Sequence, residues 1–137
     1  MPILDVAIAE AREPQIVPEA RYRLECTAAT GRLTKKGDRN MIVSTWLITN
    51  PPKSINHPKP IMCFNVLPNA NDYQEKPEMA NDWVVRAIRM CHAAGYKPKG
   101  TTIDTDQLIG KRCEVAVGVG TDQNGEQVNE PVWPKFE

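Results

Sequence analysis

No apolar run in this sequence approaches the roughly 20 residues that a membrane-spanning helix needs. The N-terminus also lacks the basic start and the apolar core of a secretory signal. From these absences we expect a cytoplasmic protein without a membrane partner.

The four cysteines form no CxxC pair, and there are only two histidines, His57 and His92. We therefore expect four reduced, buried thiols, with a zinc site built from distant positions as the alternative.

The motifs of common catalytic chemistry are missing too. The sequence contains no GxxxxGK[ST], GxGxxG, HExxH or GxSxG. Lys111 follows a glycine in "LIGKRC" but precedes a predicted strand, whereas the lysine of a phosphate-binding loop opens a helix. Asp104 and Asp106 are one residue apart before a short turn, which favours a helix cap over a magnesium site. We expect a non-catalytic protein that uses no metal and no cofactor.

An excess of either charge is absent as well, since 17 basic and 17 acidic residues cancel. The charges nevertheless fall in blocks. Residues 21–59 carry a net +6 and residues 83–112 a net +4, and the three segments around them are acidic. Because a nucleic-acid surface depends on where charges lie, a neutral total does not exclude one. We expect folding to gather the cations on one concave sheet surface and to leave the acids on the opposite side; solvated faces are the alternative.

What the sequence has in abundance is strand patterning punctuated by twelve prolines. From Arg21, "RYRLECTAATGRL" alternates apolar and polar residues with the period of a half-buried strand. After a turn at Gly37 and Asp38, "MIVSTWLITN" is rich in β-branched residues and ends at two prolines. A third short strand, "IMCFNVLP", completes an antiparallel meander over residues 21–67.

The period then changes to that of a helix. Apolar residues recur at i, i+4 through residues 79–91, with Pro77 near the start and Gly95 at the end. Asp82 can pair with Arg86 one turn later, which would make that arginine a helix-stabilising residue. Next, "CEVAVGVG" and "VNEPVW" read as two strands joined by an Asn-Gly turn.

Three strands, a helix and a two-stranded hairpin follow the plan of an OB-fold, a partly open five-stranded barrel with its helix between strands three and four. An ordinary α+β sandwich with the same elements is the alternative. We expect a single domain over residues 1–137. Residues 1–18 form a short helix or an extended arm, and the pattern leaves both possibilities open.

Proteins that hold single-stranded nucleic acid combine basic grooves with aromatic stacking platforms. Basic residues lie on the first predicted strand, at the hairpin tip, in the next loop and before the fourth strand. They are Arg21, Arg23, Lys35, Lys36, Arg39, Lys59 and Arg112. Trp46 and Phe64 are candidate platforms, although their alternation with other apolar residues also fits a core position. Tyr73, in a polar segment, is the aromatic residue that we most expect to be exposed.

The order of these segments resembles the small single-stranded-DNA-binding proteins of tailed bacteriophages. "VPEARYRLECTAA" is similar to the family's first strand, and "LTKKGDRNMIVSTWLI" to its basic loop and second strand. "WVVRAIRMCHAAGY" is similar to its helix, and "LIGKRCEVAVGVGTDQNGEQVNEPVW" to its closing strands. The resemblance covers about residues 16–134 and rests on loose motifs.

The resemblance implies an OB-fold that coats single-stranded DNA in the bacterial host cytoplasm during phage DNA replication, recombination or repair. Many relatives recruit replication or recombination proteins through an acidic tail; here acidic residues 122–130 would serve a weaker version of it. The alternative function is a protein-interaction module, an inhibitor or scaffold, that binds no nucleic acid. The oligomeric state is left open, and a homo-oligomer is one possibility.

Overall fold

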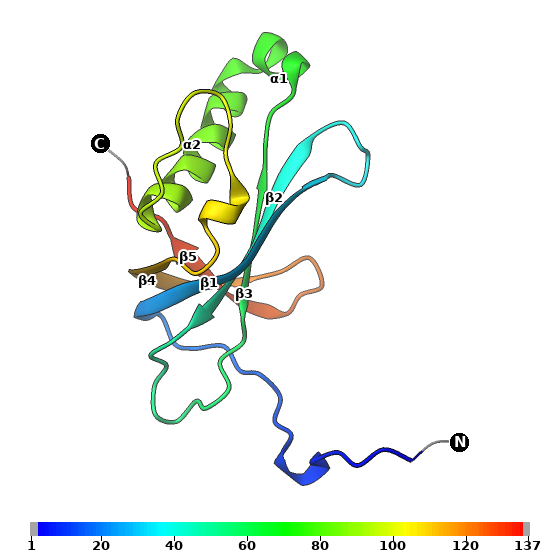
Figure 1. Ribbon diagram of the computed structural model, residues 1–137, viewed down its shortest axis with the longest axis vertical. Helices are drawn as coiled ribbons and strands as arrows, with labels where there is room; N and C mark the ends of the chain where they lie inside the picture. The colour runs from blue at the N-terminus through cyan, green and yellow to red at the C-terminus, as the bar shows by residue number, and fades with distance from the viewer. Residues whose placement is uncertain (1–2, 136–137) are drawn as a thin grey trace.

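The computed structural model describes residues 3–135, which form one five-stranded antiparallel sheet with the strand order β3-β2-β1-β4-β5 (Figure 1). Its strands are β1 (Ala20–Leu33), β2 (Asn40–Ile48), β3 (Ile61–Val66), β4 (Arg112–Thr121) and β5 (Gln127–Val132). Helix α2 (Pro77–Ala93) follows β3, so the predicted order of elements is confirmed. The edge strands β3 and β5 lie close to each other but are not paired. The prediction of one domain includes residues 1, 2, 136 and 137, which lie outside the described residues.

Strand β1 joins the two halves of the sheet. Its first part pairs with β4 through Ala20–Glu25, and its second part pairs with β2 through Leu24–Leu33. The β1–β2 register shifts between Cys26 and Ala28, as in a β-bulge. A bulge bends a strand and increases its twist, which lets a single strand belong to both halves.

The core lies between α2 and the inner face of the sheet. Trp46 of β2 is completely buried there, and its indole Nε1 donates to the Ser44 hydroxyl at 2.9 Å. Its ring centroid lies 5.0 Å from that of Trp133, which follows β5. Helix α2 contributes its buried residues to the same core, namely Ala87, Met90 and Cys91.

A short helix that the sequence analysis missed, α1 (Ala70–Glu75), precedes α2. Its start is fixed by a capping box. The Asn69 side chain accepts from the backbone N–H of Asp72 at 3.0 Å, and the Asp72 carboxylate accepts from the backbone N–H of Asn69 at 2.9 Å. The Asn-x-x-Asp spacing was visible in the sequence, but six residues are too few to show helical periodicity.

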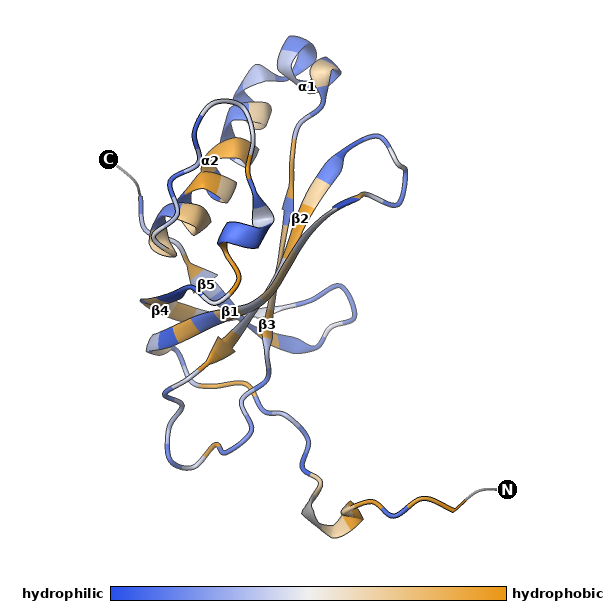
Figure 2. Cartoon of the chain, in the orientation of Figure 1, coloured by the Kyte–Doolittle hydropathy of each residue, from blue (hydrophilic) through white to orange (hydrophobic). Residues whose placement is uncertain are grey.

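The N-terminal arm, residues 3–13, is extended apart from one 3₁₀ turn (Ile8–Glu10). It runs away from the rest of the protein (Figure 2). The chain is first held at Gln15, whose N–H donates to the carbonyl of His57 and whose carbonyl accepts from the N–H of Lys59. Of the segment for which the sequence left a short helix or an extended arm open, the described residues thus contain both an extended backbone and one short 3₁₀ turn.

Asn129 of β5 holds the segment that leads into β1. Its buried amide accepts from the N–H of Val17 and donates to the carbonyl of Val17, both at 2.8 Å, and it also donates to the carbonyl of Gly118 at 3.2 Å. Val17 is 1% exposed, so water cannot replace these bonds. The Asn129 side chain thus takes the place that a neighbouring strand's backbone would have.

Replacing Asn129 by Leu should destabilise the protein, because a similar volume is kept while the backbone groups of Val17 lose their partners. Each buried polar group left unpaired costs about 1–3 kcal/mol. Urea unfolding measures the change, with Asn56→Leu in an exposed loop as the control. Equal unfolding midpoints for Asn129→Leu and the control would contradict this role.

The four cysteines are free thiols. Cys26 and Cys91 are buried, and Cys63 and Cys113 are partly buried. Burial raises the pKa of every one of them, to about 12 for Cys63 and to about 11 for Cys91 and Cys113. They are therefore protonated, weakly reactive thiols near neutral pH.

No helix within residues 3–135 is both long and apolar enough to cross a bilayer.

Candidate nucleic-acid interface

We call the side of β1, β2 and β3 that faces away from the core the outer face. The strand register sets its side chains in rows across the three strands. From one end to the other, the rows are Ala28–Thr45–Met62, Thr30–Val43–Phe64 and Arg32–Met41–Val66. Adjacent strands lie about 4.8 Å apart, so each row is a continuous strip of side chains.

Phe64 gives this face an exposed aromatic ring. Phe64 is 55% exposed and its neighbour Met62 is 53% exposed, because β3 is an edge strand and both side chains point outward. Val43, beside Phe64 on β2, is 7% exposed and supports the ring from the side. The ring is therefore exposed and available for stacking. The alternation of residues along β3 had fitted both this position and a core position for Phe64.

The prediction that Trp46 stacks on a base is wrong. Trp46 faces the core and is 0% exposed, so neither face of its indole can reach a ligand. Its row partners Cys26 and Ile61 are also buried.

Tyr73 of α1 is 56% exposed, as expected, and lies on the helix whose cap contacts the loop between β1 and β2.

Lys35 and Lys36 are the two central residues of a tight turn between β1 and β2. The N–H of Gly37 donates to the carbonyl of Thr34 at 2.8 Å, and Gly37 has a φ of +72°, which suits glycine. Both lysines are exposed, and neither forms an ion pair within residues 3–135. Their charges are therefore available to a polyanion.

Arg39, predicted as a third phosphate-binding cation in this loop, is already paired. Its Nε and Nη2 donate to the two carboxylate oxygens of Asp72, each at 2.8 Å, and its Nη1 lies 3.2 Å from Asp38. The guanidinium is also 5.4 Å from the ring centroid of Trp83. Arg39 therefore fastens the β1–β2 loop to α1 and is not a free cation of this loop.

Asp72 is electrostatically suited to this contact. The hydrogen bonds from Arg39, and then the one from the backbone N–H of Asn69, lower its pKa from 3.8 to about 2. The carboxylate is therefore charged at all physiological pH values. It is also largely buried, at 5% exposure, which shields the pair from solvent.

Breaking this pair should destabilise the protein in a pH-dependent way. The depressed pKa of Asp72 contributes stability above the pKa of the unfolded state, and that stability is lost as the pH falls from about 4 to about 2. Arg39→Ala and Asp72→Asn should both unfold at lower urea concentration than wild type at pH 7, and the difference should shrink toward pH 2. Asp82→Asn, at an exposed carboxylate on α2, is the control. A difference independent of pH would show that the ion pair is not its source.

The remaining predicted cations do not form a purely basic surface. Arg21 and Arg23 are exposed on β1, where they lie across from β4. Arg23 is opposite Glu114, and the Nε of Arg112 donates to Glu25 at 2.9 Å. The expectation that the acids would lie on the opposite side of the sheet is therefore wrong here, because these two glutamates stand among the arginines. Arg23 and Arg112 nevertheless line one hollow of about 400 Å³.

A groove of about 630 Å³ separates β3 from β5. Phe64 and Met62 line its β3 side together with Lys59, and Arg86 of α2 borders it as well. Glu130 and Asp122 line its other side. Lys59 lies 3.8 Å from Glu126, so this predicted cation is loosely paired.

Arg86 is a candidate that the sequence analysis did not select. The helical pattern suggested a pair with Asp82, yet within the described part of the chain Arg86 is exposed and forms no ion pair. It lies beside Phe64, Asn65 and Trp83 at the end of β3. Only the packing of α2 across β3 places it there, and no local sequence signal could have done so.

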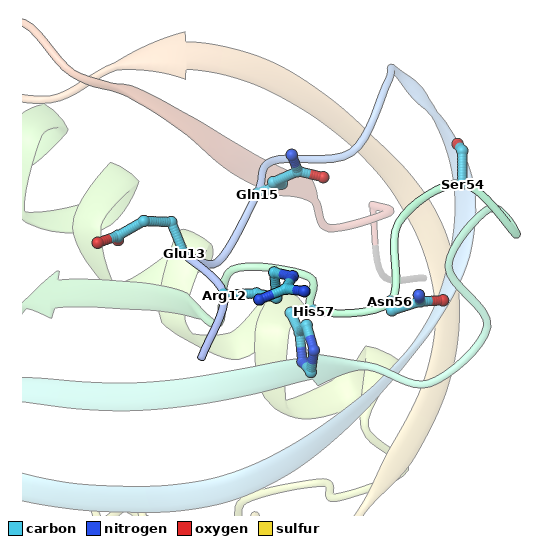
Figure 3. A pocket seen from close by; sticks show the side chains of 6 residues that line it. All are labelled: Arg12, Glu13, Gln15, Ser54, Asn56 and His57. Carbon is cyan, nitrogen blue, oxygen red and sulfur yellow. The ribbon is translucent and has the colours of Figure 1, made fainter. Parts of the chain in front are cut away.

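A separate hollow of about 500 Å³ lies between the base of the N-terminal arm and the loop before β3. Arg12 and Glu13 of the arm line it together with Gln15, the residue that anchors the arm, and Ser54, Asn56 and His57 line it from the loop (Figure 3). The Nη1 of Arg12 donates to the carbonyls of Ala9 and Ala11, which occupies part of its guanidinium. None of the predicted binding residues lines this hollow.

Across residues 3–135, no three potential ligands among histidine, cysteine, aspartate and glutamate come together as a metal site would require.

In comparisons with known proteins, no family model matches the chain and no curated protein is similar to it.

Proposed function

We propose that this protein binds single-stranded DNA through the outer face and the cations around it, within an OB-type barrel. The observation that carries the proposal is the exposed Phe64 on the outer face. The three rows of side chains on this face, together called the strip below, are mostly small or aliphatic, and unpaired cations lie at its borders. An exposed aromatic ring beside backbone-binding cations is the arrangement that sequence-tolerant single-strand binders use.

The cations that border this strip approach it from four elements. Lys35 and Lys36 lie in the turn beyond its Arg32 row, and Arg86 lies beside Phe64. At the other end of β1, Arg23 and Arg112 border their shared hollow. A strand of DNA laid across the outer face would meet the unpaired Lys35 and Lys36 on one side, and Phe64 with Arg86 on the β3 side. Arg23 and Arg112 would add positive charge at the other end of β1, where Glu25 and Glu114 offset part of it.

Little sequence preference is expected from the chemistry of the strip. Its central side chains are Ala28, Thr30, Thr45, Met62 and Phe64, with no amide or carboxylate among them to read base edges. Stacking and methyl contacts tolerate any base, because every base has a π-face. The proposed role is to coat single strands exposed during phage DNA replication, recombination or repair in the bacterial cytoplasm.

The turn that carries Lys35 and Lys36 should contribute part of the salt dependence of binding. In fluorescence-anisotropy titrations with oligo-dT, affinity should fall linearly with salt on a log–log plot. Lys35→Ala/Lys36→Ala should weaken binding and reduce that slope by about 1.4, since each single-strand phosphate contact contributes about 0.7. The unfolding midpoint should not change, because both lysines are exposed and unpaired.

Lys97→Ala/Lys99→Ala, in the exposed loop after α2, removes the same charge and is the matched control. An equal loss of affinity in both variants would mean that only net charge matters. Duplex DNA and oligo-U in parallel titrations test the preference for single-stranded DNA. No binding of oligo-dT even at low salt would reject the proposal and favour a protein-interaction module.

Phe64 should contribute directly to affinity. Phe64→Ala should weaken oligo-dT binding by about 1–3 kcal/mol, or roughly five- to 150-fold, if one base stacks on the ring. Phe64→Tyr keeps the stacking surface and should bind like wild type. Ile109→Ala, at an exposed apolar residue in the loop before β4, controls for a general loss of surface hydrophobicity. Unchanged affinity in Phe64→Ala would remove the outer face from the site.

A further inference from the structure

The N-terminal arm exposes more apolar surface than any function described so far explains. Ile3, Leu4, Val6 and Ile8 are 93%, 77%, 66% and 77% exposed. In Figure 2 this segment is a hydrophobic stretch that extends away from the sheet and both helices. Single exposed apolar residues are ordinary, but four within six positions mark a contact surface.

The arm has the pattern of a strand without a sheet. Leu4, Val6 and Ile8 alternate with Asp5 and Ala7, so an extended backbone puts the three large side chains on one face. Residues 3–7 lie outside any helix or strand. The six residues 3–8 also match the six residues of β3 in length.

Strand β3 offers the complementary edge. It pairs with β2 on one side only, so backbone N–H and C=O groups on its other side remain open to an added strand. Charge distinguishes it from the other edge strand: Lys59 and Arg86 lie on the β3 side of the groove, and Asp122 and Glu130 on the β5 side. Residues 3–8 carry a single charge, that of Asp5, which favours the β3 side.

The anchor of the arm directs it away from its own β3. Gln15 forms a parallel bridge with Pro58, so residues before Gln15 run beside residues before Pro58. Strand β3 begins after that point, at Ile61. To reach its own β3 edge, the arm would have to reverse direction at the anchor, whereas a neighbouring copy imposes no such constraint.

We propose that residues 3–8 add as an extra strand to the free edge of β3 in a second copy of this chain. Leu4, Val6 and Ile8 would then be buried in the groove between β3 and β5 of that copy. The 3₁₀ turn would open at Ile8, its first residue. If two copies each add their arm to the β3 of the other, they form a closed dimer. If each copy adds its arm to the β3 of the next copy, the copies form an open row. The proposal does not depend on nucleic-acid binding.

Sedimentation velocity of the full-length protein without oligonucleotide, over a wide concentration range, tests the proposal. Wild type should associate with increasing concentration. Leu4→Ser/Ile8→Ser should weaken self-association roughly a hundredfold, because two large side chains lose their burial. Ala7→Ser/Ala9→Ser changes the opposite face of the arm and should associate like wild type. Neither variant touches the core, so all three proteins should fold.

Hydrogen exchange identifies the receiving strand. Amides of residues 61–66 should exchange more slowly as wild type associates, and should show no such change in Leu4→Ser/Ile8→Ser. A wild-type protein that stays monomeric at every concentration overturns the proposal. So does association that survives in Leu4→Ser/Ile8→Ser, or that is lost equally in Ala7→Ser/Ala9→Ser. Protection confined to other elements would overturn β3 as the receiving edge.

Discussion

The whole sheet depends on one strand being shared between its two halves. Among the described strands, β1 alone connects the β2–β3 pair to the β4–β5 pair. The bulge between Cys26 and Ala28 lets it turn from one half to the other while Tyr22, Leu24 and Cys26 stay buried on the same face. The outer face exists because of this geometry: past the bulge, β1 pairs with β2 only, and its polar side chains border the exposed side of β2 and β3.

Much of the architecture could be predicted from sequence because its signals are local. Alternation located the strands, and the change of period with its proline and glycine boundaries located α2. Asn-Gly placed the last hairpin, whose turn the structure has at residues 122–125. Alternation could not tell which face of a strand is buried when both faces carry apolar side chains. On β2, both the Trp46 face and the Val43 face are apolar, and on β3 the partly polar face of Cys63 and Asn65 is the one that turns inward.

The candidate site was predictable only in part, for a related reason. Lys35 and Lys36 could be placed because a turn exposes its central residues whatever the rest of the fold does. Arg39 could not, since its partner Asp72 is distant in sequence and belongs to a helix too short to recognise. The same holds for the glutamates beside Arg23 and Arg112, which strand pairing brings into place. Charge blocks along a chain therefore do not predict which cations stay unpaired after folding, whereas a turn does predict that its central residues are exposed.

The contact between Arg39 and Asp72 has a consequence for how the adjacent loop would meet a ligand. A free hairpin tip samples many conformations, and a ligand that fixes it must offset the entropy lost on association. Here the loop is tied to the cap of α1 on one side and closed by its own turn on the other, so its two free ammonium groups are held on an ordered backbone before anything arrives. For a polyanionic ligand, such preorganisation would let more of the electrostatic attraction appear as affinity.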